Sequence, residues 1–173
     1  MRTNSAFAAM IATAFVFILL LSFGISRPVH AMPPAPPTDA CSLLTEDQVK
    51  AVLGLAVGAG QHIVPNNSSL CGWEQPGQSG ASRKRVLVSI YVPLGKLSPI
   101  DRFNAAKTPV NGITKTPVSG VGDDAIYATT PGVGIGLIFK KADSAFDVRV
   151  YGFADDETKA KEKTLAGDII AKL

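Results

Sequence analysis

The hydrophobic pattern of residues 41–54, "CSLLTEDQVKAVLG", predicts a short helix. Thr45 and Gln48 have the spacing of a capping box, in which each side chain bonds the backbone amide of the other residue. Apolar residues recur at helical spacing after this start, and Gly54 supplies a C-terminal stop because glycine tolerates the left-handed conformation. The apolar face of this helix is expected to consist of Leu44, Val49, Val52 and Leu53.

The pattern changes to short β-branched and aromatic runs between residues 55 and 92. These runs are "GQHIV", "SLCGWEQ" and "KRVLVSIYV", and the turn-forming segments "PNNSS" and "PGQSGAS" separate them. In the third run both alternating faces carry apolar residues, which is typical of a central strand.

A second helix is predicted from Ser98–Pro99, an N-cap followed by proline at the first helical position, and it ends before Pro109. Residues 108–122 are rich in loop-forming residues. Three strands follow at "DAIYAT", "VGIGLIFKK" and "AFDVRVYGF", and a last helix starts at Asp155 or Asp156. Because the order lacks β-α-β alternation, we predict an α+β fold, an antiparallel sheet of five to six strands with helices packed on one side.

The N-terminal segment has the layout of a signal peptide. Arg2 gives a positive start, an apolar run covers residues 6–24, and "SRPVHA" ends in the small residues Val29 and Ala31. We predict export and cleavage after Ala31; the alternative is an uncleaved membrane anchor, because a run of this length can span a bilayer. The predicted organisation is a signal peptide at 1–31, a proline-rich linker at 32–40 and a single α+β domain at 41–173.

The charge balance gives little support to a polyanionic partner. Removal of Arg2 and Arg27 with the leader reduces the 17 basic residues to 15, against 14 acidic residues. The remaining basic residues also lack the interleaved aromatic residues that are typical of nucleic-acid binding. We therefore expect no nucleic-acid partner and, after signal cleavage, no membrane span.

Cys41 admits three interpretations. A lipidated cysteine lies at the signal cleavage point, whereas Cys41 lies 17 residues beyond Gly24. A nucleophile would gain from the following helix dipole but needs a base, and His62, the one histidine of the mature chain, lies in no recognisable motif. A disulfide with Cys71, the only other cysteine, fits an oxidising compartment and would close a loop of about 30 residues, worth about 3.5 kcal/mol. We predict the Cys41–Cys71 disulfide.

Other motifs favour structural roles, and we expect no catalytic residue, metal or cofactor. His62 lacks the further ligands that a metal site needs. The pair Asp123–Asp124 lacks the oxygen spacing of a calcium loop and is typical of a turn. Gly132, Gly134 and Gly136 lead into a strand instead of a helix, so they favour close approach of another element, or a bend in the strand, over phosphate binding.

The cluster Arg83, Lys84 and Arg85 is the strongest local concentration of charge. These three residues are the candidate contacts for an anionic partner, such as a lipid headgroup or an acidic polymer of the envelope. The alternative is a solvated loop end that protects a strand from aggregation. Three surface cations are a marginal membrane anchor alone, at about 1 kcal/mol each.

Three stretches together resemble a known class of proteins: "ACSLLTEDQVKAVLG", "CGWEQPG" and "PVSGVGDDAIYA". The chain is similar, over roughly residues 39–172, to small exported bacterial domains of unknown function with a C-S-L-L-T helix start and a C-x-W strand, many of them lipoproteins. The resemblance implies a cystine-stapled α+β envelope domain in which Cys41 and Cys71 occupy the paired positions. It implies no activity, and this chain departs from the lipoproteins in lacking a lipidation site.

These observations together predict a periplasmic or secreted, non-catalytic binding or accessory protein of the bacterial envelope. Its partner would be an envelope protein or a small ligand held on the sheet face or in the loops at 76–85 and 108–122. The alternative is an envelope hydrolase, which would require a pocket with clustered titratable groups. A further alternative, an anchored module, requires that the leader stays attached.

Overall fold

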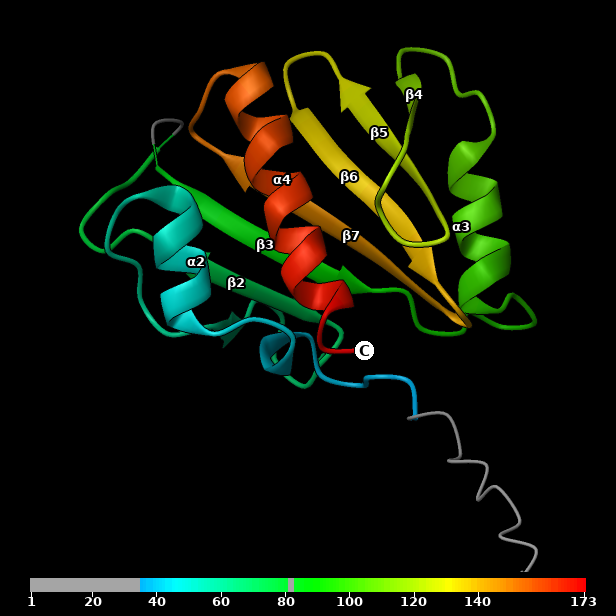
Figure 1. The fold of residues 1–173 in the computed structure, drawn as a ribbon, viewed down its shortest axis with the longest axis horizontal. Helices are drawn as coiled ribbons and strands as arrows, with labels where there is room; N and C mark the ends of the chain where they lie inside the picture. The colour runs from blue at the N-terminus through cyan, green and yellow to red at the C-terminus, as the bar shows by residue number, and fades with distance from the viewer. Residues whose placement is uncertain (1–34, 81–82) are drawn as a thin grey trace, which may run out of the picture. The chain divides into compact units, whose positions relative to one another are not determined.

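The computed structural model describes residues 35–80 and 83–173, and the predicted signal peptide and its cleavage site after Ala31 lie outside these residues. The elements in chain order are η1 (Ala40–Ser42), α2 (Glu46–Leu53), β1 (Gln61–His62), β2 (Leu70–Glu74), β3 (Arg85–Ile90), α3 (Pro99–Lys107), β4 (Thr114–Val118), β5 (Asp124–Thr130), β6 (Gly134–Lys141), β7 (Ser144–Tyr151) and α4 (Asp155–Ile170) (Figure 1).

The strands form one antiparallel sheet in the order β1-β2-β3-β7-β6-β5-β4, which confirms the predicted α+β class. The described residues hold seven strands, and the prediction of five to six was too low. The missed strand is β4, which lies in the segment expected to be a loop. Strand β4 contains Pro117 and lies at the edge of the sheet, where a proline without an amide hydrogen is tolerated.

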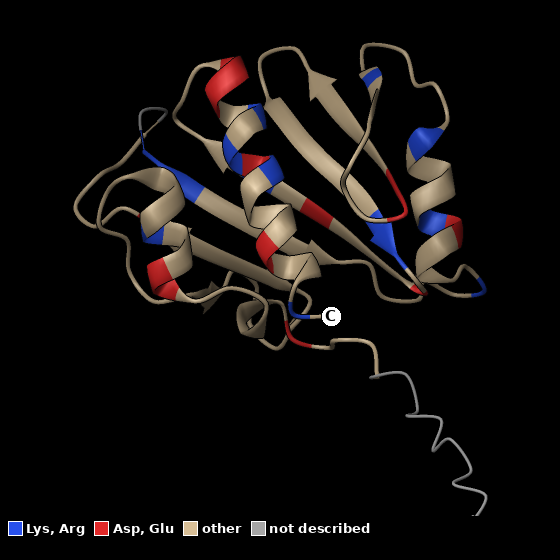
Figure 2. Cartoon of the chain, viewed as in Figure 1, with Lys and Arg blue, Asp and Glu red and all other residues tan. Residues whose placement is uncertain are grey.

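Local side-chain chemistry sets the helix starts, as predicted. Thr45 and Gln48 form the capping box of α2, and Gly54 ends that helix with a φ of 72°. Ser98 caps α3 from the position before Pro99. The first turns of α2 and α4 carry acidic residues, visible in red in Figure 2, which stabilise the positive end of each helix dipole. Within the described residues, no helix combines the length and apolar character that a bilayer span requires.

The helices pack on both faces of the sheet, so the prediction that all lie on one side was wrong. Helices α2 and α4 contact each other, and α4 crosses β6 and β7 on the first face (Figure 1). On the opposite face, Phe103 of α3 packs with Ile126, Ile138 and Ala145. These apolar residues alternate with those of the first face, so strands β5–β7 need cover on both sides.

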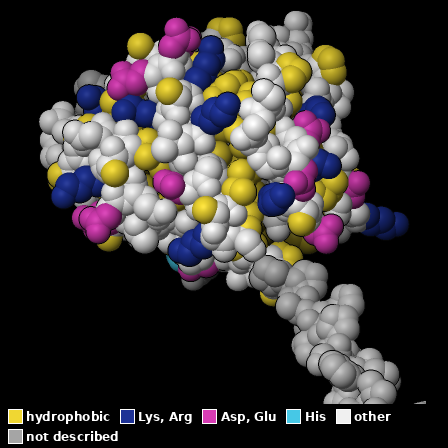
Figure 3. Space-filling model, in the orientation of Figure 1, with side chains coloured by type: hydrophobic (Ala, Val, Ile, Leu, Met, Phe, Trp, Pro, Cys, Tyr) yellow, Lys and Arg dark blue, Asp and Glu magenta, His cyan; other side chains and the backbone are white. Residues whose placement is uncertain are grey.

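The main core lies between the first face of the sheet and the helices α2 and α4. Its largest fully buried side chains include Trp73 of β2, and Phe139 and Phe146, which stack with ring centroids 5.1 Å apart. On the outside of this layer, cationic and anionic side chains are interspersed (Figure 3). This surface has no large area of a single charge, in agreement with the nearly balanced composition.

Glu162 of α4 is a charged residue type in the middle of this core. Its side chain is fully buried, and its Oε1 accepts a hydrogen bond from the backbone amide of Val150 at 3.0 Å. Its Oε2 has no hydrogen-bond partner among the described residues. Burial raises the pKa of Glu162 to about 8, against the opposing effect of the Val150 amide. The carboxyl group is therefore mostly protonated at neutral pH.

Replacing Glu162 with glutamine should flatten the dependence of folding stability on pH. The folded-state pKa is above the unfolded value, so the folded protein keeps a proton that the unfolded chain loses. Stability is therefore highest below the unfolded pKa and falls as the pH rises toward about 8, with a slope of at most about 1.4 kcal/mol per pH unit from this group. Urea unfolding at pH 5 and pH 8 measures the slope.

The exposed Glu157 on the same helix provides the matched control, because Glu157→Gln should keep the wild-type slope. Equal slopes in the wild type and Glu162→Gln would contradict this account of the buried carboxyl group.

Candidate functional site

The predicted cationic cluster does not face one way. Lys84 lies on the α4 side of the sheet. Its Nζ is 4.6 Å from the centroid of the Phe153 ring, and Nζ of Lys161 in α4 is 4.7 Å from the same centroid. Arg83 and Arg85 lie on the other side, because alternate residues of an extended chain share a face. Of the three candidate contacts for an anionic partner, the structure thus brings together Arg83 and Arg85 and separates Lys84.

Tyr151 and Glu74 hold the two arginines in place. Arg85 lies directly opposite Tyr151 in the pairing of β3 with β7, and its guanidinium carbon is 4.5 Å from the centroid of the Tyr151 ring. Arg83 donates to Oε2 of Glu74 at 2.9 Å, whereas Arg85 approaches Oε1 of Glu74 only to 4.0 Å. Arg83 is therefore closely paired, and Arg85 is stacked with its charge only loosely compensated.

A pocket of about 380 Å³ opens beside Arg85. It is bounded by the turn between β5 and β6 and by the connection from β7 to α4, and its lining includes Arg83, Arg85, Gly132, Gly134, Tyr151 and Asp155. The glycine-rich segment and the cationic cluster, which are nearly 50 residues apart in the sequence, meet here. The structure shows this juxtaposition, and contact with an anion stays a prediction.

Next to this pocket, Arg149 and Asp147 form a two-point ion pair that sequence reasoning missed. Nη2 and Nε of Arg149 donate to Oδ2 of Asp147 at 3.0 and 3.1 Å. Burial tends to lower the pKa of Arg149, but the Asp147 carboxylate outweighs it and holds that pKa above its ordinary value. Their spacing of two residues on a strand was the available signal, since it places both side chains on one face.

Gly136 makes room for this ion pair. A Cβ atom on Gly136 would lie 3.0 Å from Nε of Arg149 and 3.1 Å from Oδ1 of Asp147. The third glycine of "GVGIG" therefore allows a close approach, as the sequence predicted, and Arg149 and Asp147 are the side chains that approach.

Gly136→Ala should destabilise the protein by about 1–3 kcal/mol, because the added methyl group must displace the Arg149–Asp147 pair. The control is Gly167→Ala in α4, where a Cβ atom would have no neighbour within 4 Å. That change should stabilise the protein by about 0.4–1 kcal/mol. Thermal or urea unfolding measures both, and a neutral effect of Gly136→Ala would show that the pair moves aside freely.

The other predicted positions have structural partners. Asp123 accepts from Nζ of Lys141 at 2.9 Å and from the amide of Ala142 at 2.7 Å, and thereby fixes the turn between β6 and β7. Asp124 pairs with Lys107 of α3 at 2.5 Å. The predicted partner-binding segment 108–122 contributes to a second pocket of about 370 Å³, which Lys159 and Lys163 of α4 also line. The carboxylates thus act as turn and helix contacts.

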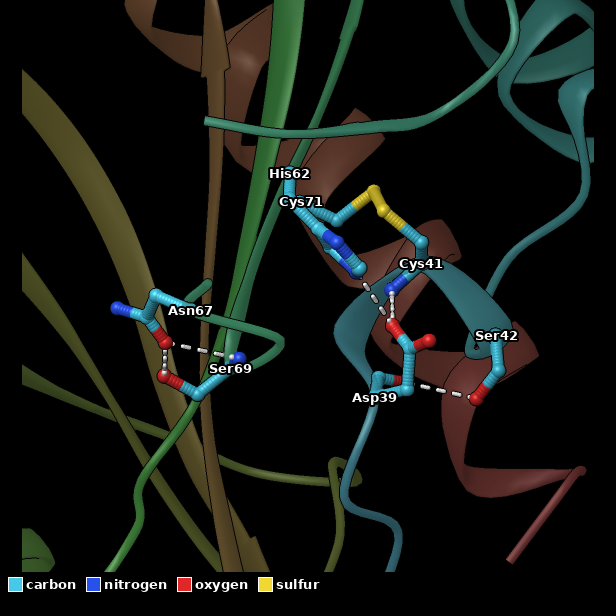
Figure 4. The surroundings of a disulfide bond; sticks show 7 residues. All are labelled: Asp39, Cys41, Ser42, His62, Asn67, Ser69 and Cys71. Atoms are coloured by element: carbon cyan, nitrogen blue, oxygen red, sulfur yellow. Dashed lines mark hydrogen bonds and ion pairs between the residues drawn. A yellow bond between two sulfur atoms is a disulfide. The ribbon is translucent and has the colours of Figure 1, made fainter. Parts of the chain in front are cut away.

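The predicted disulfide is present between Cys41 of η1 and Cys71 of β2, which are 30 residues apart (Figure 4). Cys71 is fully buried, and Trp73, two residues further along β2, is buried in the same core. Because Cys41 is bonded to Cys71, its sulfur is not a free thiol for nucleophilic chemistry in this form. The staple attaches the start of the domain to the sheet.

His62 and Asp39 lie beside the disulfide. Nε2 of His62 is 2.9 Å from Oδ1 of Asp39, and the same oxygen accepts the amide hydrogen of Cys41 at 2.8 Å (Figure 4). The hydrogen bond with His62, followed by that from Cys41, holds the pKa of Asp39 below its ordinary value. The sequence analysis considered His62 alone. It did not predict the pairing of β1 with β2, which places His62 opposite Cys71.

Removing the disulfide should cost about 3.5 kcal/mol of folding stability, because the unfolded chain regains the freedom of a loop of about 30 residues. The double variant Cys41→Ala/Cys71→Ala and the wild type in excess reductant should lose similar amounts in urea unfolding. A loss below about 1 kcal/mol in both would contradict a stapling role.

Comparisons with protein-family models, with curated proteins and with solved structures found no match to this chain. The similarity to small exported domains of unknown function therefore stays a prediction from the motifs. Two separate places are therefore defined by geometry alone. At the candidate binding site, Arg85 lies over Tyr151 beside the pocket. At the other place, Asp39 and His62 lie beside the disulfide.

Proposed function

We propose that this protein is an exported, disulfide-stapled domain of the bacterial envelope that acts as a non-catalytic binding module. The disulfide supports this proposal, because such bonds form and persist in oxidising compartments. The leader-like N-terminus and the C-S-L-L-T and C-x-W motifs support it from the sequence. Its partner is an envelope protein or a small ligand.

The stacking of Arg85 on Tyr151 carries the assignment of the binding site. An arginine whose guanidinium lies over an aromatic ring leaves its N–H donors available, and its planar fork loses little entropy on binding. Such donors suit the two oxygens of a carboxylate or a phosphate. Glu74 compensates Arg83 closely and Arg85 only at 4.0 Å, so Arg85 is the residue that would receive the anionic group.

The lining of the pocket also limits the partner. Asp155 is one of its lining residues, so the lining carries both signs of charge and does not suit a dense polyanion. The backbone at Gly132 and Gly134 lies open in the lining because glycine carries no side chain. The partner favoured by this arrangement presents one anionic group together with hydrogen-bonding groups, as an acidic peptide segment or a small carboxylate or phosphate ligand does.

An NMR titration with inorganic phosphate as a probe that carries one anionic group tests this site. Amide signals near Arg85, Gly132 to Gly134 and Tyr151 should shift together. Arg85→Gln should weaken binding at least about tenfold, because a hydrogen bond to a charged group is worth about 1.5–3 kcal/mol.

Lys84→Gln provides the matched control, since it removes the same charge from the neighbouring residue on the other side of the sheet. It should change the affinity by less than about threefold, because Lys84 does not line the pocket. The assignment of Arg85 would be overturned if the amide signals shifted mainly around lysines outside the pocket. It would also be overturned if Arg85→Gln and Lys84→Gln weakened binding equally.

A further inference from the structure

Three potential metal ligands converge where η1 meets the edge of the sheet, and a fourth is bonded to one of them. One ligand atom each from Asp39, Cys41 and His62 lies within 4.8 Å of the other two. The fourth, Cys71, is bonded to Cys41 and lies opposite His62 in the pairing of β1 with β2 (Figure 4). Residues directly opposite in an antiparallel pair share a face, so His62 and Cys71 point to the same side.

The donor set is suited to zinc. Two thiolates, one imidazole and one carboxylate are all ligands that Zn²⁺ accepts in a four-coordinate, tetrahedral site. With zinc–nitrogen and zinc–oxygen bonds of about 2.0–2.2 Å, neighbouring tetrahedral ligands lie about 3.3–3.5 Å apart. Nε2 of His62 and Oδ1 of Asp39 are already 2.9 Å apart, so a small separation would admit the ion.

The surrounding backbone holds these ligands while leaving a route for the ion. The amide of Ala40, between Asp39 and Cys41, donates to the carbonyl of Ser68 at 2.8 Å, which ties η1 to the segment before β2. Ala40 and Cys71 are fully buried, whereas His62 is exposed and Asp39 and Cys41 are partly exposed. An ion can therefore reach Asp39, Cys41 and His62 from solvent.

We propose that reduction of the Cys41–Cys71 disulfide converts this cluster into a zinc site formed by Cys41, Cys71, His62 and Asp39. A dithiol reductant supplies two electrons and two protons, breaks the sulfur–sulfur bond and becomes a disulfide itself. Zinc then displaces the two thiol protons and binds the two thiolates. Disulfide and zinc are mutually exclusive, and each ties η1 to β2, so the metal replaces the covalent staple under reducing conditions.

Titration of the reduced exported protein with Co²⁺, an optical substitute for Zn²⁺, tests the proposal. One equivalent should produce thiolate-to-cobalt charge transfer and the visible bands of a tetrahedral site, and Zn²⁺ should abolish both. The oxidised protein should give no such signal. A reduced protein that binds less than one equivalent, or one that gives an octahedral spectrum, would overturn the proposal.

Variants of the two ligands other than cysteine, His62 and Asp39, distinguish a four-ligand site from binding by the two thiolates alone. His62→Ala and Asp39→Asn should each weaken Co²⁺ binding substantially, and His62→Ala by more than about 100-fold, because loss of a second-shell partner alone costs about 10–100-fold. Gln61→Ala is the matched control, since Gln61 pairs with Gly72 and points to the other face. Unchanged affinity in His62→Ala would overturn the four-ligand site.

Far-UV circular dichroism keeps the test decisive if the reduced, metal-free protein unfolds. One equivalent of Zn²⁺ should then restore the native spectrum in the wild type, because an ion that binds the folded form favours folding. Cys41→Ala/Cys71→Ala should show no such recovery. Failure of zinc to refold the reduced wild type would count against the proposal.

Discussion

The pairing of β3 with β7 joins the two halves of the sheet. Strands β1–β3 come from the N-terminal half and β4–β7 form a continuous meander, and within the described residues these two groups meet in the sheet only along six residue pairs from Arg85–Tyr151 to Ile90–Phe146. A shift of one residue in this register would turn every side chain of one strand to the other face. This one alignment therefore sets which side chains of β7 enter the core, Val148 and Val150, and which face outward, Arg149 and Tyr151.

This alignment explains why the candidate binding site lies where it does. Arg85 and Tyr151 form the outermost pair of the junction, where β3 begins and β7 ends, and both line the pocket. Arg149, two residues before Tyr151, is engaged by Asp147 over Gly136. The sheet therefore offers one loosely compensated guanidinium beside one that is closely paired with a carboxylate, an arrangement that favours recognition of a single group.

The sequence predicted features that depend on neighbouring residues. The starts of α2 and α3 follow from Thr45 with Gln48 and from Ser98 with Pro99, and the chemistry of these residues acts within one helical turn. Alternation likewise identified the strands β3 and β7. The disulfide was predictable because only one partner for Cys41 existed.

Other features depend on contacts between distant residues and could not be read locally. Edge position permits Pro117 in β4, and that position is set by the whole topology. The contact of Asp39 with His62 requires β1 to lie beside β2, and the burial of Glu162 requires α4 to cross β7. The division of Lys84 from Arg85, by contrast, follows from strand alternation and was available in the sequence.

The two edges of the sheet have a consequence for how the molecule behaves at high concentration. Strand β1 is two residues long. Strand β4 carries a charge at Lys115, and its Pro117 interrupts the row of amide donors because proline has no amide hydrogen. Natural proteins use short edges, charges and prolines to prevent a second chain from adding its own strand. Crowded copies of this domain therefore find little free backbone to pair with, and growth of a fibril from the native sheet has no good starting edge.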